Sequence, residues 1–156
     1  MALIIYFIAQ AIIYEHPFPA FSYNTIANAS SIAASIGLEN QATYDAAQTR
    51  TGYLTTEYAK ITLPGHALPI IEIAILLPLI LFWPAALVAR LVFGVIAVVG
   101  VYYLNSARIA LLLYVDHFYP AYFPWAKNYV VPLSYMLILL VFFFVYALVF
   151  GRIQKQ

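Results

Sequence analysis

The chain has 156 residues, of which 65% are hydrophobic and 8% are charged, and its formal net charge is +1. A soluble domain carries about 25% charged residues, so this composition excludes a globular surface covered by polar side chains and places the chain in a lipid bilayer. The near-neutral charge argues against nucleic acid as a partner. The absence of cysteine excludes disulfides, thiolate metal sites and thiol nucleophiles.

We expect a single all-α integral membrane domain, residues 1–156, with about four transmembrane helices and no cofactor. The first apolar run, MALIIYFIAQAIIY, is shorter than the roughly 20 residues needed to cross. We interpret it as a retained span, because it lacks the basic start and the cleavage site of a signal peptide. The other three runs each exceed the crossing length. The expected spans are residues 2–14, 67–89, 91–115 and 129–150.

The longest polar segment, residues 15–65, separates the first two spans. Part of it carries apolar side chains at helical spacing, which predicts a short amphipathic helix that begins near Ser22 and ends at Gly37. Residues 42–63 are rich in Thr and Tyr and predict a small hairpin or an extended segment. The apolar positions of the expected helix are Ile26, Ala29, Ile32, Ala33 and Ile36.

Basic residues set the expected orientation. Arg90 lies in the turn between the second and third spans, and Arg152 and Lys155 follow the fourth. We therefore expect a multi-pass protein of the cytoplasmic (inner) membrane with both termini in the cytoplasm and residues 15–65 outside. Lys127, between the third and fourth spans, is the exception to this rule.

Two charges inside the apolar runs mark a candidate site. Glu72 is early in the second span and Arg108 is late in the third. At a rise of about 1.5 Å per residue, Glu72 lies about 8 Å and Arg108 about 10 Å below the outer edge of their spans. Charges in hydrocarbon need a partner or a wet cavity, so each is a functional candidate. We expect the two groups to meet.

Other polar groups converge on the same level. Asn105 shares a helix face with Arg108 because it is three residues away. His66 is at the outer start of the second span, and His117 lies at the mouth of the third. The candidate binding residues are therefore Glu72, Asn105, Arg108 and His66. The alternative is that a Glu–Arg–Asn cluster only locks two helices together, as interhelical polar contacts do in membranes.

The segment from PGHALPIIE through WPAALVAR to LNSARIALL resembles the exosortase/archaeosortase family of membrane transpeptidases. The resemblance covers about two-thirds of the chain, and the Asn-x-x-Arg-Ile segment is its most specific part. Members use a Cys nucleophile with Arg and His partners. Only the arginine carries over, as Arg108, with Asn105 beside it. Gly65 or His66 stands where the Cys is expected, and PWAKNYVV stands where the later His is expected.

These departures favour a non-catalytic relative that acts as an accessory or scaffold subunit of a larger membrane complex, with the bilayer and other membrane subunits as partners. A first alternative is a divergent protease or transpeptidase that processes protein C-terminal tails at the outer leaflet. Its catalytic residues would be Arg108, His66 and His117, with Ser106, Thr62 or Thr56 as an oxygen nucleophile that needs a nearby base. A second alternative is a proton- or ion-handling subunit with Glu72 and Arg108 as a relay.

Overall fold

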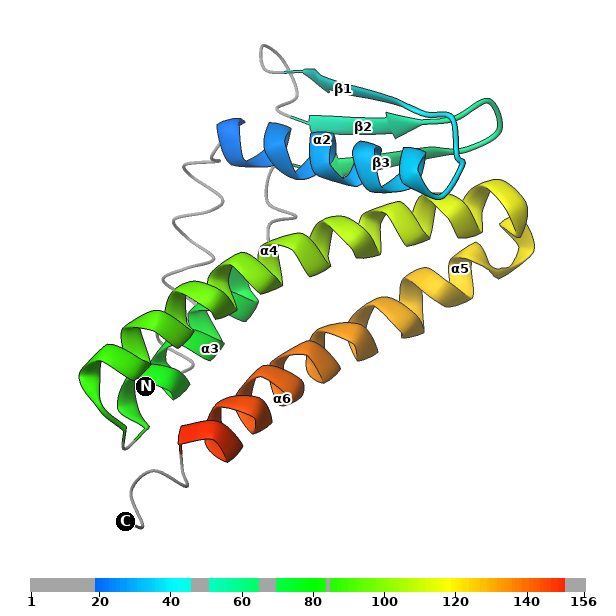
Figure 1. Cartoon of the computed structure of the whole chain (residues 1–156). Helices are drawn as coiled ribbons and strands as arrows, with labels where there is room; N and C mark the ends of the chain where they lie inside the picture. Colours follow the sequence, from blue (N-terminus) through cyan, green and yellow to red (C-terminus); the bar gives the residue numbers. More distant parts are fainter. Residues whose placement is uncertain (1–18, 46–50, 65–69, 84, 151–156) are drawn as a thin grey trace.

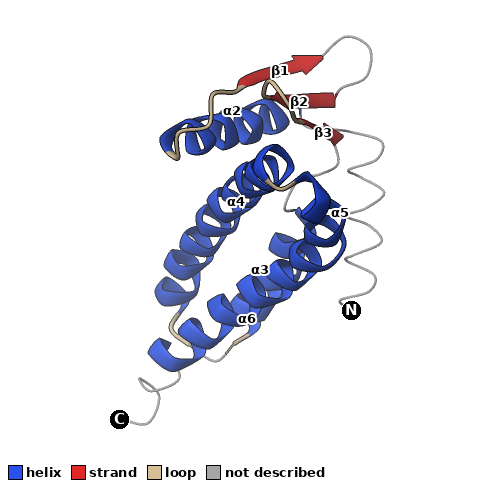
Figure 2. Cartoon of the chain, turned by 90° about the vertical axis from the view of Figure 1, so that its right-hand side faces the viewer, coloured by secondary structure: helices blue, strands red, loops and turns tan. Residues whose placement is uncertain are grey.

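A computed structural model describes residues 19–45, 51–64, 70–83 and 85–150. The expected first span, His66, Arg152 and Lys155 lie outside these residues. Helix α2 and a three-stranded sheet form a layer at one end of the molecule, and the long helix α4 runs beneath that layer and continues past it (Figure 1). Helices α3 and α6 pack along the other part of α4, as the view turned by 90° also shows (Figure 2).

Helix α2, Pro19–Ser35, is the expected helix of the polar segment, but it begins three residues earlier than Ser22. Proline at the first helical position is favourable because its missing N–H has no partner there in any helix. Gly37, at φ 82°, ends the helix as expected. The amide of Leu38 donates to Ala33 O at 3.0 Å and that of Gly37 donates to Ala34 O at 3.0 Å, which is the Schellman arrangement.

The expected hairpin is a larger unit, an antiparallel sheet of β1 (Gln41–Asp45), β2 (Thr51–Thr55) and β3 (Lys60–Pro64) in the order β1-β2-β3. Gly52, opposite Tyr44 and Leu63 in the central strand, faces α2. A Cβ there would lie 1.5 Å from Ile26 Cδ1. The missing side chain thus allows α2 to lie directly on the sheet.

The turn between the second and third expected spans lies earlier in the chain than Arg90, where it was expected. Helix α3, Ile70–Phe82, ends seven residues before the expected Ala89, and α4, Leu87–Phe118, begins before Arg90. The prediction that Arg90 lies in the turn is therefore wrong. The reason is local, because the residue before a proline is disfavoured in the α conformation and Trp83 precedes Pro84. Arg90 instead occupies the first turn of α4, where its amide donates to Ala86 O.

Helix α4 and the helical stretch Pro120–Val149 are long and apolar enough to cross a membrane. They correspond to the expected spans 91–115 and 129–150. Helix α3 has 13 residues, or about 20 Å, and is short for a hydrocarbon core of about 30 Å. Two candidate spans, rather than four, are therefore found in the described part of the chain. The second consists of the 3₁₀ turn η1 (Pro120–Tyr122), α5 (Phe123–Trp125), the π-helix η2 (Ala126–Val130) and α6 (Val131–Phe150).

Two separate apolar clusters hold these elements together. The sheet-side core joins α2, the sheet and the second half of α4, and the helical core joins α3, the first half of α4 and α6. Arg108 and Asn105 lie on α4 between the two. The sheet-side core contains Ile26, Ala29, Ala33, Leu38, Leu54, Ala59, Ile61, Ile109, Ala110 and Leu113. The helical core contains Leu76, Ile80, Ala85, Phe93, Ala97, Val101 and Tyr146.

Candidate functional site

Arg108 is held between two helices. One turn earlier on α4, Asn105 Oδ1 accepts a hydrogen bond from Arg108 Nη2, as expected for residues three apart on one helix face. From α6, the ring of Tyr135 lies under the guanidinium, with 3.6 Å between the ring centroid and Arg108 Cζ. A cation over an aromatic face is attracted to it most strongly where water is excluded. Tyr135 and Asn105 together fix the plane of the guanidinium.

The cluster has more donors than acceptors. Arg108 Nε, Arg108 Nη1 and Asn105 Nδ2 are all buried and have no hydrogen-bond partner. Each such group costs about 1–3 kcal/mol relative to a solvated one. All three are N–H groups, so an acceptor-rich group beside Arg108 would satisfy them together.

Glu72 lies near Arg108 but does not contact it. The carboxylate is in the first turn of α3 and is buried, and its charge interacts with that of Arg108. Among the described residues, however, no hydrogen bond or ion pair joins the two groups, and the guanidinium donates to Asn105 instead. The structure therefore places the two charges on neighbouring helices without the direct contact that their matched depth predicts.

Two pockets meet at Arg108. A basic pocket of about 370 Å³ lies between β3, α4 and η2, and its polar lining comes from Lys60, Thr62, Arg108 and Lys127. An apolar pocket of about 270 Å³ lies between α4 and the chain that follows it. Arg108, Leu112 and Val131 line both. The apolar pocket is also lined by Leu111, Val115, Tyr119, Tyr122, Trp125, Ala126 and Val130.

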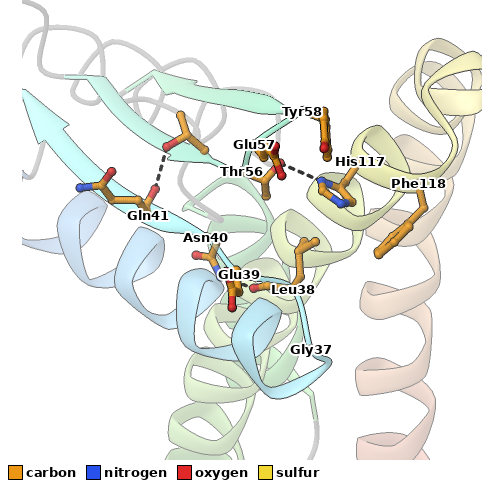
Figure 3. A pocket seen from close by; sticks show the side chains of 11 residues that line it. Gly37, Leu38, Glu39, Asn40, Gln41, Thr56, Glu57, Tyr58, His117 and Phe118 are labelled. Carbon is orange, nitrogen blue, oxygen red and sulfur yellow. Dashed lines mark hydrogen bonds between the residues drawn. The ribbon is translucent and has the colours of Figure 1, made fainter.

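His117 belongs to a different pocket, of about 550 Å³, where α4 ends beside the connections α2–β1 and β2–β3 (Figure 3). Its Nδ1 lies 3.0 Å from Thr56 Oγ1, and its ring centroid is 5.3 Å from that of Tyr58. The Thr56 hydroxyl also accepts from the amide of Ala59 at 2.9 Å. His117 is nine residues, or about 14 Å of helix, from Arg108, so the two side chains do not share a pocket.

The oxygen nucleophiles considered from the sequence differ in their surroundings. Ser106 is fully buried and donates to Tyr102 O at 3.3 Å. Thr62 lines the basic pocket with Arg108. Thr56 is the one with an imidazole within hydrogen-bond reach among the described residues.

Sequence reasoning missed Tyr135 and the part that Lys127 plays in the basic pocket. Neither follows from spacing within one helix, since both depend on where the last helix packs. In comparisons with protein-family models, with curated proteins and with solved structures, no match to this chain was found.

Proposed function

We propose that this chain is a non-catalytic, exosortase-like membrane protein that acts as an accessory or scaffold subunit of a larger membrane complex. The observation that carries the proposal is the chemistry around Arg108. The family mechanism needs a thiolate beside this arginine, and the chain has no cysteine. Among the described residues, the one imidazole lies in the separate pocket with Thr56. What remains at Arg108 is a set of binding groups: a guanidinium, an amide and an aromatic ring.

The exposed helix faces support the scaffold role. In the most apolar part of Pro120–Val149, 6% of the residues are buried by the rest of the chain, and the corresponding share for α4 is 22%. Helices that are apolar all round pack against lipid or against other helices. Leu133, Leu137, Leu140, Phe144 and Leu148 form an exposed stripe at helical spacing on α6 that a partner helix would cover.

Photo-crosslinking in native membranes tests this role. A photoreactive residue placed in turn at Leu137, Leu140 and Phe144 is expected to give one crosslinked species with the same membrane protein from all three positions. A probe at Tyr146, which is fully buried, is the matched control and should give none. If the α6 stripe crosslinks to lipid alone and the protein is recovered as a monodisperse single species, the scaffold role is wrong.

One contact favours a second candidate, a divergent protease or transpeptidase. Thr56 Oγ1 and His117 Nδ1 are close enough for the imidazole to act as a base toward the hydroxyl. An activated hydroxyl reacts with a fluorophosphonate, so the test is mass spectrometry of the labelled full-length protein. Labelling of Thr56 that disappears in His117→Gln would favour the enzyme, and an unlabelled Thr56 would count against it.

A further inference from the structure

The basic pocket is built to receive an anion. Arg108, whose buried Nε and Nη1 have no acceptor, and Lys127, whose side chain is exposed, both line this pocket. Lys60 lines the pocket as well, while its Nζ lies 4.5 Å from the ring centroid of Tyr53. Glu72 is not among the lining residues, and the described part of the pocket wall carries cations without a carboxylate. A guanidinium with free N–H groups binds the oxygens of a phosphate or carboxylate in a fixed geometry.

The apolar pocket adds a second requirement. It adjoins the basic pocket, because Arg108, Leu112 and Val131 line both. Its walls are aliphatic and aromatic, and Arg108 contributes only apolar surface to them. A ligand that fills both pockets therefore carries an oxyanion at one end and a hydrocarbon chain at the other.

The position along α4 fits a lipid headgroup. Arg108 lies 21 residues after Leu87, or about 32 Å along the helix axis, which is close to the thickness of a hydrocarbon core of about 30 Å. If α4 enters the core at its first turn rather than at the expected Leu91, the guanidinium lies at the level of the headgroup boundary instead of about 10 Å below it. Tyr119, Tyr122 and Trp125 line the apolar pocket and are largely exposed. Such aromatic side chains are enriched at this same level of a bilayer.

We propose that these two adjoining pockets bind one anionic phospholipid, with its phosphate at Arg108 and Lys127 and one acyl chain in the apolar pocket. Basic pockets beside membrane helices recognise headgroups in this way. The inference shares with the scaffold role only the placement in a membrane. Its test measures lipid rather than protein contacts, so the two can fail separately.

The test uses the full-length protein in mixed micelles and native mass spectrometry, with phosphatidylglycerol and phosphatidylcholine of identical acyl chains as probes. We expect one phosphatidylglycerol to be retained after the other lipids have been removed. Arg108→Met should abolish its retention. Lys127→Gln should weaken binding about tenfold or more, because a charged hydrogen bond is lost. Lys155→Gln, the same charge change beyond the other end of α6, should leave binding unchanged.

A variant on the apolar side keeps the proposal testable if Arg108→Met fails to fold. Val115 lines the apolar pocket but not the basic one, so Val115→Trp should fill the space for the acyl chain and abolish retention while all donors remain. Equal retention of both phospholipids by the wild type would overturn the proposal. So would full competition by oleate, which points to a fatty acid, or by inorganic phosphate, which points to a free anion.

Discussion

The two ends of helix α4 are built differently, and its two described arginines show the difference. At the α3 end, Arg90 turns back and donates from Nε to Ala85 O at 2.7 Å and from Nη1 to Leu81 O at 3.0 Å. These are carbonyls at and just beyond the last turn of α3, where a cation is favourable. At the sheet end, Arg108 keeps two N–H groups without acceptors. Arg90 thus joins α4 to the end of α3, whereas Arg108 keeps donors that a ligand could satisfy.

This contrast bears on what Arg108 is for. An arginine that only joins helices is expected to find carbonyls or a carboxylate, as Arg90 does. Arg108 has Glu72 on the adjacent helix and does not contact it. Because unsatisfied buried donors lower stability, the arrangement at Arg108 is better explained by a ligand than by helix packing.

The largest expected loss of stability distinguishes the sheet-side core from the helical core. Leu54, in the sheet-side core, and Leu76, in the helical core, are both fully buried. We expect Leu54→Ala to cost about 2–5 kcal/mol of unfolding free energy. We expect Leu76→Ala to cost about 1–2 kcal/mol, because helices in a bilayer pack without the transfer of apolar surface from water. The measurement is the thermal unfolding midpoint in detergent micelles, at about 2–4 °C per kcal/mol. Equal losses of unfolding free energy would mean that both clusters are stabilised to the same extent by the removal of apolar surface from water.

The next effect concerns the α3 end. Arg90→Gln should cost about 1.5–3 kcal/mol, because two charged hydrogen bonds to Ala85 O and Leu81 O are lost. The thermal midpoint of the detergent-solubilised variant measures this loss. Arg90→Lys is the control, since it keeps the charge near α3 and should recover part of the loss. An unchanged midpoint for Arg90→Gln would remove the proposed difference between the two arginines.

A smaller effect is expected at the contact between α6 and α3. Tyr146 is fully buried, and its hydroxyl donates to Ile80 O at 3.1 Å. Tyr146→Phe should lower stability by about 0.5–1.5 kcal/mol while the ring stays packed. Phe142→Leu, which changes apolar packing nearby without removing a hydrogen bond, provides the comparison. A stabilised Tyr146→Phe would show that this hydrogen bond does not hold α6 on α3.

The smallest effect is expected at Arg108 itself. In lipid-free detergent, Arg108→Met should change the unfolding free energy by less than about 1 kcal/mol, because an apolar side chain of similar volume removes a buried charge with open donors. Glu72→Gln should be similarly mild. Had the two groups formed the helix-locking pair that their depth predicts, each variant would cost several kcal/mol. If both variants lost several kcal/mol of unfolding free energy in thermal scans, Glu72 and Arg108 would form such a pair after all.

Local patterns predicted part of this fold. The helix of the polar segment and its end at Gly37 followed from apolar spacing and from the one residue type that adopts positive φ without strain. The helix boundary near Arg90 was misplaced because hydropathy is uniform across residues 67–115. The break instead follows from Pro84 and from the carbonyls to which Arg90 turns.

The candidate site was predictable only within one helix. Asn105 and Arg108 were recognised because spacing of three is local. Tyr135, Lys127 and the pair Thr56–His117 come together through long-range packing. No periodicity in a single sequence carries that information.

The π-helical turn Ala126–Val130 determines how α6, which follows it, is rotated about the helix axis. A π turn holds one residue more than an α turn, and one residue corresponds to about 100° of rotation about the helix axis. If the same residues adopted α geometry, the extra residue would rotate α6 as a whole by that angle, whereas deleting one residue would leave its orientation unchanged. With that rotation, Tyr135 would swing away from Arg108, and Tyr146 would leave Ile80. This short irregular turn therefore fixes the rotation of α6 at which Tyr135 faces Arg108 and Tyr146, eleven positions later, reaches Ile80.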